Sequence, residues 1–140
     1  MIGRTVMTID INREAQIIEM LRSIGCGLKP ARTQSRSRVR ALVVESATLS
    51  QPVVIHKDRL NAIRVAVAPA MYRTELEDEH HGVRAARNIR SSLNQFRHSA
   101  YCAFANADAM GEPVAKCYEI DWDNGGCLEK LRKLLVGLMH

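Results

Sequence analysis

Arginine is the residue type of this chain with the clearest capacity for chemistry, and it gathers in two stretches. Six positive side chains and no carboxylate lie between residues 22 and 40, and a second set recurs at near-helical spacing after residue 83. Guanidinium groups bind phosphates and carboxylates in forked geometry. The candidate binding residues, for a partner or for phosphate, are Arg32, Arg36, Arg38, Arg40, Arg84, Arg87 and Arg90.

Carboxylates and histidines form a second cluster, Glu75-Leu76-Glu77-Asp78-Glu79-His80-His81. These residue types could ligate a metal ion. However, carboxylates at the start of a helix are expected from its macrodipole alone, and adjacent histidines point in different directions. We therefore predict a set of surface acids, with no metal and no cofactor.

Signatures of catalysis are missing from the sequence. The four cysteines (Cys26, Cys102, Cys117 and Cys127) are widely spaced, without the Cys-X-X-Cys pattern that lowers a thiol pKa. Gly125-Gly126 lacks the Lys and Ser/Thr that follow a phosphate-binding loop. We therefore predict that the protein is not an enzyme.

Composition indicates one domain over residues 1–140. Hydrophobic residues make up 46% and charged residues 25%, with a net charge of +5. The sequence contains no run of about 20 apolar residues and no signal peptide at its start, so we expect a cytoplasmic protein that does not enter a membrane. We interpret residues 1–7 as a loose N-terminal tail and residues 28–38 as a basic linker.

The first half of the chain predicts a helix followed by three antiparallel strands. The helix spans residues 8–24, from an N-cap at Asp10 to a stop at Gly25-Cys26-Gly27. The strands span residues 39–46, 52–57 and 62–68, and the first is apolar on both faces, as in the centre of a sheet. In the third, Ile63, Val65 and Val67 face one way.

The second half predicts a short helical turn at Thr74, where Glu77 completes a capping box, then an amphipathic helix over residues 83–97. A hairpin of residues 99–106 and 113–122 follows, and a leucine-rich helix spans residues 127–139. A hairpin loop over residues 107–112 would place three pairs opposite each other, namely Cys102 and Cys117, Tyr101 and Tyr118, and Phe104 and Ala115.

The predicted fold is therefore a single α+β domain, with a mostly antiparallel five-stranded sheet and three helices in the order α-β-β-β-α-β-β-α. The helix ending Ser92-Leu93-Asn94-Gln95-Phe96, the turn with Asp108 and Gly111, the strand 116–121 and the helix from Leu128 carry a resemblance. In these elements the chain resembles the class I chaperones of type III secretion and their bacterial sensory relatives. The resemblance implies a non-enzymatic homodimer that holds an extended segment of a partner protein.

The sequence is compatible with two functions. The first is a protein-binding adaptor or chaperone-like module. The second is a nucleic-acid-binding accessory protein that would use the basic linker and the arginine-striped helix to neutralise phosphates. Arginines paired to carboxylates such as Glu75, Glu77 and Asp78 would favour the adaptor.

Overall fold

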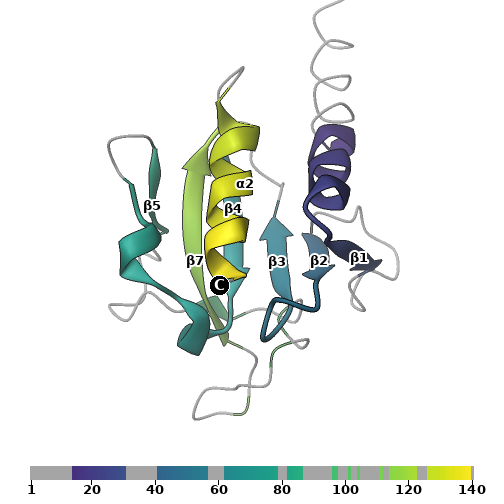
Figure 1. Ribbon diagram of the computed structural model, residues 1–140. Coiled ribbons are helices and arrows are strands. Elements are labelled where there is room, and N and C mark those ends of the chain that lie inside the picture. Colours follow the sequence, from purple (N-terminus) through teal and green to yellow (C-terminus); the bar gives the residue numbers. More distant parts are fainter. Residues whose placement is uncertain are drawn as a thin grey trace, which may run out of the picture.

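An antiparallel sheet with two helices forms the core of the protein, so the α+β class is confirmed (Figure 1). The computed structural model describes residues 14–30, 41–56, 62–78, 82–86, 96–97, 101, 104, 111, 114–122 and 126–139. Six strands follow the order β1 (Gly27–Pro30), β2 (Ala41–Glu45), β3 (Val53–His56), β4 (Ala62–Val67), β7 (Val114–Asp121) and β5 (Val83–Ala85). The short β6 (Phe96–Arg97) also pairs with β7. In the part of the chain that the structure describes, the strand and helix counts thus differ from the predicted five and three.

The predicted three-stranded meander is present as β2, β3 and β4. Val43 lies opposite Val54, which in turn lies opposite Ala66, so the three strands are in antiparallel register. The interior position predicted for the first of them is confirmed, because β2 lies between β1 and β3. The linker predicted over residues 28–38 is wrong at its start, since Gly27 to Pro30 pair with Glu45 to Leu42 as strand β1.

The amphipathic helix predicted over residues 83–97 is wrong at both ends. Residues 83–85 form β5, in which Val83 lies opposite Ile120, and Phe96 in β6 lies opposite Ala115. Residues 87–95 lie outside the described residues. Helical periodicity in the sequence was overridden by the backbone hydrogen bonds that the second edge of β7 offers to a neighbouring strand.

The predicted hairpin register is also wrong. Tyr118 lies opposite Val65 on one neighbouring strand and Ala85 on the other, and Cys117 lies opposite Ala66. Tyr101 packs in an apolar cluster on one face of the sheet, whereas Tyr118 packs in the cluster on the other face. β4 and β5 pair with β7 on its two edges, so strands distant in sequence are its neighbours there rather than a local hairpin partner. Alternate residues of β7 then point to opposite faces of the sheet. Cys102 lies outside the described residues.

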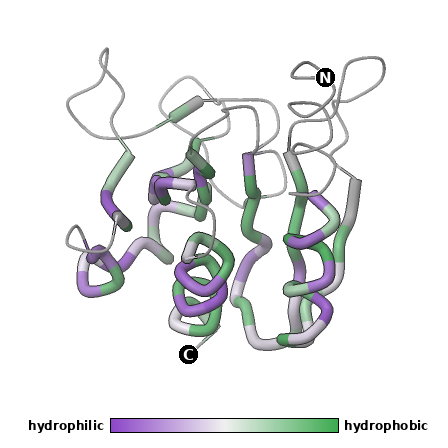
Figure 2. Tube along the Cα trace, turned by 90° about the horizontal axis from the view of Figure 1, so that it is seen from above, coloured by the Kyte–Doolittle hydropathy of each residue, from purple (hydrophilic) through white to green (hydrophobic). Residues whose placement is uncertain are grey.

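The sheet separates two apolar clusters. On one face, the helix of residues 14–23 and α2 (Cys127–Leu138) cover alternate residues of the strands, and Ile17, Leu21, Leu131 and Leu135 are fully buried there. The prediction that Ile63, Val65 and Val67 of β4 face one way is confirmed, because all three lie in this cluster. Figure 2 shows hydrophobic and hydrophilic residues alternating around α2, as expected of a helix with one buried side.

The opposite face carries a second cluster. It contains residues of the same strands that point the other way, together with aromatic side chains from the segment before β7: Val43, Val54, Ala66, Phe96, Tyr101, Phe104, Ala115 and Cys117. The hydroxyl of Tyr101 lies 3.8 Å from the sulfur of Cys117. Both faces of the central strands are therefore buried.

Two short 3₁₀ turns, η1 (Pro69–Met71) and η2 (Thr74–Leu76), lead from β4 toward β5. The turn predicted at Thr74 is therefore present, but no side chain caps it, so the predicted capping box is not formed. Among the described residues, no helix has the length and apolar character needed to cross a membrane.

The first helix ends as predicted at Gly25, which has φ of 81°. The N–H of Cys26 donates to the carbonyl of Leu21 at 2.9 Å, and the N–H of Gly25 donates to that of Arg22 at 3.1 Å. This pair of bonds is the Schellman motif, which requires a left-handed residue.

We expect Gly25→Ala to lower the free energy of unfolding by about 1–2 kcal/mol, because alanine is strained at positive φ. The matched control is Gly27→Ala in β1, where an added Cβ meets only the Glu45 carbonyl at 4.0 Å. Denaturant unfolding of both variants measures the difference. Equal destabilisation by the two substitutions would contradict the assignment of the helix end.

Candidate functional site

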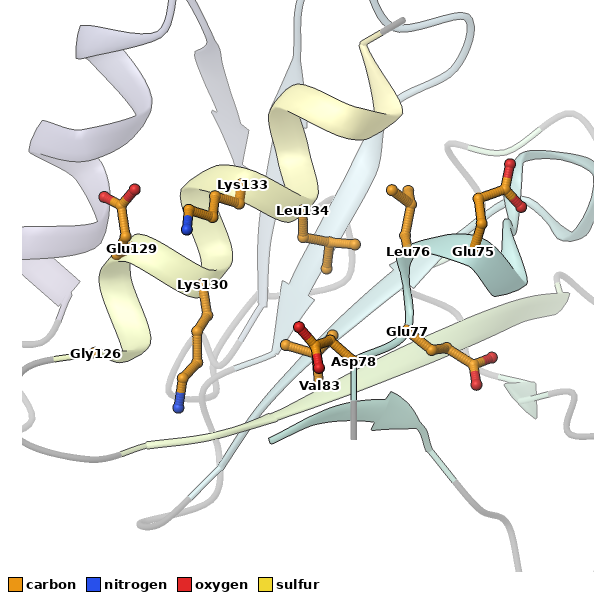
Figure 3. Close-up of a pocket in the computed structure, with 10 residues that line it drawn as sticks. All are labelled: Glu75, Leu76, Glu77, Asp78, Val83, Gly126, Glu129, Lys130, Lys133 and Leu134. Atoms are coloured by element: carbon orange, nitrogen blue, oxygen red, sulfur yellow. The ribbon is translucent and has the colours of Figure 1, made fainter. Parts of the chain in front are cut away.

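A pocket of about 470 Å³ lies between α2 and the segment that runs from η2 to β5 (Figure 3). Its lining combines an apolar floor with a charged rim. Leu76, Val83 and Leu134 supply the floor. The rim and ends consist of Glu75, Glu77, Asp78, Gly126, Glu129, Lys130 and Lys133.

The hydroxyl of Tyr118 fixes the η2 side of the pocket. Tyr118 is fully buried in β7, and its hydroxyl accepts a hydrogen bond from the Arg73 N–H at 2.7 Å. The same hydroxyl donates to the Arg73 carbonyl at 3.0 Å. One side chain of the sheet therefore satisfies both backbone groups of the residue that precedes η2, and this holds the turn against β7.

Tyr72 adds a second contact of the same kind. Its ring stacks on that of Tyr118, with centroids 4.2 Å apart and planes 11° from parallel. Its hydroxyl donates to the Glu77 carboxylate at 2.7 Å. Burial, and then the hydrogen bond and negative charge of Glu77, raise the pKa of Tyr72 well above its ordinary value. The phenol therefore stays protonated and orients the carboxylate at the rim.

The C-terminal half of α2 packs closely on η2. A Cβ built at Gly137 would lie 2.7 Å from a methyl carbon of Leu76, so only glycine leaves Leu76 its present place. The guanidinium of Arg73 donates to the Gly137 carbonyl at 3.0 Å, which satisfies a backbone acceptor of the last helical turn.

The lower end of the pocket is closed by a backbone bridge between Asp78 and Val83. The N–H of each residue donates to the carbonyl of the other, at 2.7 and 2.9 Å. Gly82, with φ of 79°, supplies the left-handed conformation that this return requires. The bridge thereby holds Asp78 and Val83 side by side in the lining of the pocket.

Of the arginines predicted to bind a partner, Arg84 is the one within the described residues, and it lies on β5. Its guanidinium is 2.8 Å from an oxygen of Asp121 and 3.3 Å from one of Glu119. The hydrogen bond to Asp121 raises the pKa of Arg84. The other six, Arg32, Arg36, Arg38, Arg40, Arg87 and Arg90, lie outside the described residues.

Arg84 belongs to a row of charged side chains on the second face of the sheet. Glu119, only 14% exposed, also lies 3.8 Å from Arg64, whose guanidinium stands 4.7 Å above the ring of Phe96. Pairing of this kind is what a carboxylate needs when it is removed from water. Arg84 thus pairs with carboxylates of β7 and lies on a strand, whereas a helix was predicted there; its binding role stays a prediction.

The acidic cluster of the sequence is divided. Glu75, Glu77 and Asp78 line the pocket, whereas Glu79, His80 and His81 lie outside the described residues. The sequence did not reveal the pocket, because Lys130 and Lys133 are separated from these acids by about 50 residues. One local signal was available: Gly137 interrupts a leucine-rich helix, which indicates a close approach by another element.

Burial raises the pKa of Tyr118 to about 12, against a smaller opposing effect of the hydrogen bond from Arg73. Because the folded state holds this proton more tightly, its stabilising contribution is complete below the ordinary pKa of about 10 and is lost as pH rises toward 12. We expect the free energy of unfolding to fall over this range.

Tyr118→Phe tests this contribution. We expect it to cost about 1–2 kcal/mol near neutral pH, because it leaves the Arg73 backbone without its partner. We also expect the alkaline fall in stability to be shallower. Denaturant unfolding at a series of pH values measures both effects, and parallel curves for the two proteins would contradict the role of the hydroxyl.

Comparisons with known proteins identify no relative of this chain. No family model matches it, and it matches neither a curated protein nor a solved structure. The resemblance to class I chaperones therefore stays a prediction, and the roles of the pocket residues rest on their own chemistry.

Proposed function

We propose that the protein is a non-enzymatic, protein-binding adaptor or chaperone-like module, and that the pocket between η2 and α2 receives a side chain of the partner. The pocket is the single observation that carries the proposal. It combines an apolar floor of Leu76, Val83 and Leu134 with charged groups around the opening. Pockets with an apolar interior and a few placed polar groups are the usual form of a binding site.

The rigidity of the surrounding elements supports this proposal. Tyr118 and Tyr72 hold the η2 side, and the Leu76–Gly137 contact joins it to α2. A pocket fixed by buried side chains loses little conformational entropy when a ligand enters it. The homodimeric state and the cytoplasmic location stay predictions that accompany this function.

A nucleic-acid-binding function is the alternative, and the described residues favour it less. Arg84 is engaged by Glu119 and Asp121, so its charge is offset within the sheet. The four carboxylates that line the pocket would also repel phosphates. This alternative predicts binding that weakens steeply with salt, because each neutralised phosphate releases counterions.

The test fills the pocket. A random peptide library displayed on phage is selected on the wild-type protein, and the enriched peptides are synthesised and titrated. Lys133 is exposed on α2, so Lys133→Trp can place an indole over the opening with little risk to the fold. We expect it to weaken binding at least about tenfold, as expected when a ligand loses its buried anchor.

Arg22→Trp is the matched control. Arg22 is exposed on the first helix and does not line the pocket, and tryptophan there should leave affinity unchanged. Failure to enrich any peptide, or equal affinity of the two variants, would overturn the proposal. Salt-sensitive binding of a labelled DNA or RNA duplex that Lys133→Trp does not alter would favour the alternative.

A further inference from the structure

Leu28 is the large apolar side chain that the described part of the chain exposes to solvent. It is 39% exposed and lies in β1, an end strand of the sheet. Among the described strands, β1 pairs with β2 on one edge and with no strand on the other. An apolar side chain on such an edge favours association with another chain.

The side chain of Leu28 belongs to the face of the sheet that the helices cover. Leu28 lies opposite Val44, which is in the cluster under the helices, and opposed residues of an antiparallel pair share a face. The floor of the pocket adjoins the same cluster. β1 and β5 are the two end strands of the sheet, as Figure 1 shows. The exposed leucine and the pocket therefore lie toward opposite ends of one face.

We propose that the pocket receives Leu28 of a second copy of this chain, so that the β1 end of one copy meets the β5 end of the next. This inference rests on the proposed function and names a partner for the same pocket. A leucine suits the floor because the floor consists of aliphatic side chains. Gly27 precedes Leu28 and carries no side chain, so the backbone beside the leucine can approach the rim closely.

Charge supports this pairing, because surfaces of opposite charge attract and select each other. The leucine lies within residues 22–40, a stretch of sequence with six positive residues and no carboxylate. Four carboxylates and two lysines line the pocket, so negative charge is in excess there. Arg132 binds Glu129 and offsets one of these carboxylates. Asp121 lies beside the ammonium of Lys130 and offsets one of the lysines, so the excess is kept.

A contact between two different surfaces has a consequence for assembly. The copy that donates its leucine keeps its own pocket open, and the copy that receives it keeps its own leucine exposed. The contact is therefore heterologous and can extend into a row of copies. Small contacts are weak and transient, so we expect a dissociation constant on the order of 100 μM.

Sedimentation velocity of the full chain over a concentration series measures this association. The wild-type protein should pass from monomer to dimer and then to larger species, and added salt should weaken the association. Leu28→Ser removes the donated side chain, and Lys133→Trp covers the receiving pocket. We expect each substitution to weaken association at least about tenfold, because the burial of a leucine is worth that much or more.

A mixture of these two variants is the decisive sample. Leu28→Ser keeps an open pocket and Lys133→Trp keeps the exposed leucine, so one contact can form between them. We expect the mixture to form dimers and nothing larger, at concentrations where each variant alone is a monomer. An interface that used the same surface on both copies would not be restored in this way.

Three control variants separate the contact from general effects. Leu28→Met keeps an apolar side chain, and Lys133→Gln removes the lysine charge without covering the pocket. Ala47→Trp places an indole in the exposed turn between β2 and β3, away from both surfaces. All three should associate at least as tightly as the wild-type protein.

The outcomes separate this inference from the proposed function. A wild-type chain that stays monomeric while selected library peptides bind the pocket would overturn the inference alone, with a foreign segment as the occupant. Self-association that Leu28→Ser or Lys133→Trp leaves unchanged would also overturn it, as would a mixture that contains only monomers. Loss of both self-association and peptide binding would overturn both proposals.

Discussion

The described sheet depends on β7, because this strand is hydrogen-bonded on both edges. β4 pairs with its residues 116–121 in continuous antiparallel register, while β5 takes its residues 118–120 and β6 takes Ala115 and Val114. A central strand must satisfy every backbone group through such neighbours, since none is open to water. Segments as distant in sequence as residues 62 and 121 are therefore brought together by one strand.

Alternation along β7 then assigns its side chains to two different tasks. Tyr118 and Ile120 enter the cluster under α2 and the first helix, whereas Ala115, Cys117 and Glu119 face the opposite side. On that opposite side, Arg64 and Arg84 offset the charge of Glu119. On the helix side, the Tyr118 hydroxyl holds Arg73 and so positions η2. The candidate pocket thus depends on the alternation of side chains along a single strand, which points Tyr118 toward the helices.

Some charged side chains of this protein pair with one another within the fold. The net charge of +5 suggests a surface suited to polyanions, yet Arg84 is engaged by carboxylates of β7, and four acids line the pocket together with Lys130 and Lys133 of α2. Exposed charge contributes little to stability but can decide which ligand is accepted. Placement of charge therefore says more about function than its sum.

The sequence by itself determined the features that depend on neighbouring residues. It predicted the α+β class, the meander of β2 to β4 with Ile63, Val65 and Val67 on one side, the glycine end of the first helix, and the leucine face of α2. Each of these follows from local periodicity or from the conformational freedom of one glycine.

Tertiary structure decided the rest. Residues 83–85 have a helical pattern but form a strand, because β7 offers them hydrogen bonds that no local pattern records. Tyr101 and Tyr118 fall on different faces for the same reason. The pocket unites acids near residue 76 with lysines near residue 131. The packing of Leu76 on Gly137 and the hydrogen bond from Arg73 to the Gly137 carbonyl bring these two segments into contact.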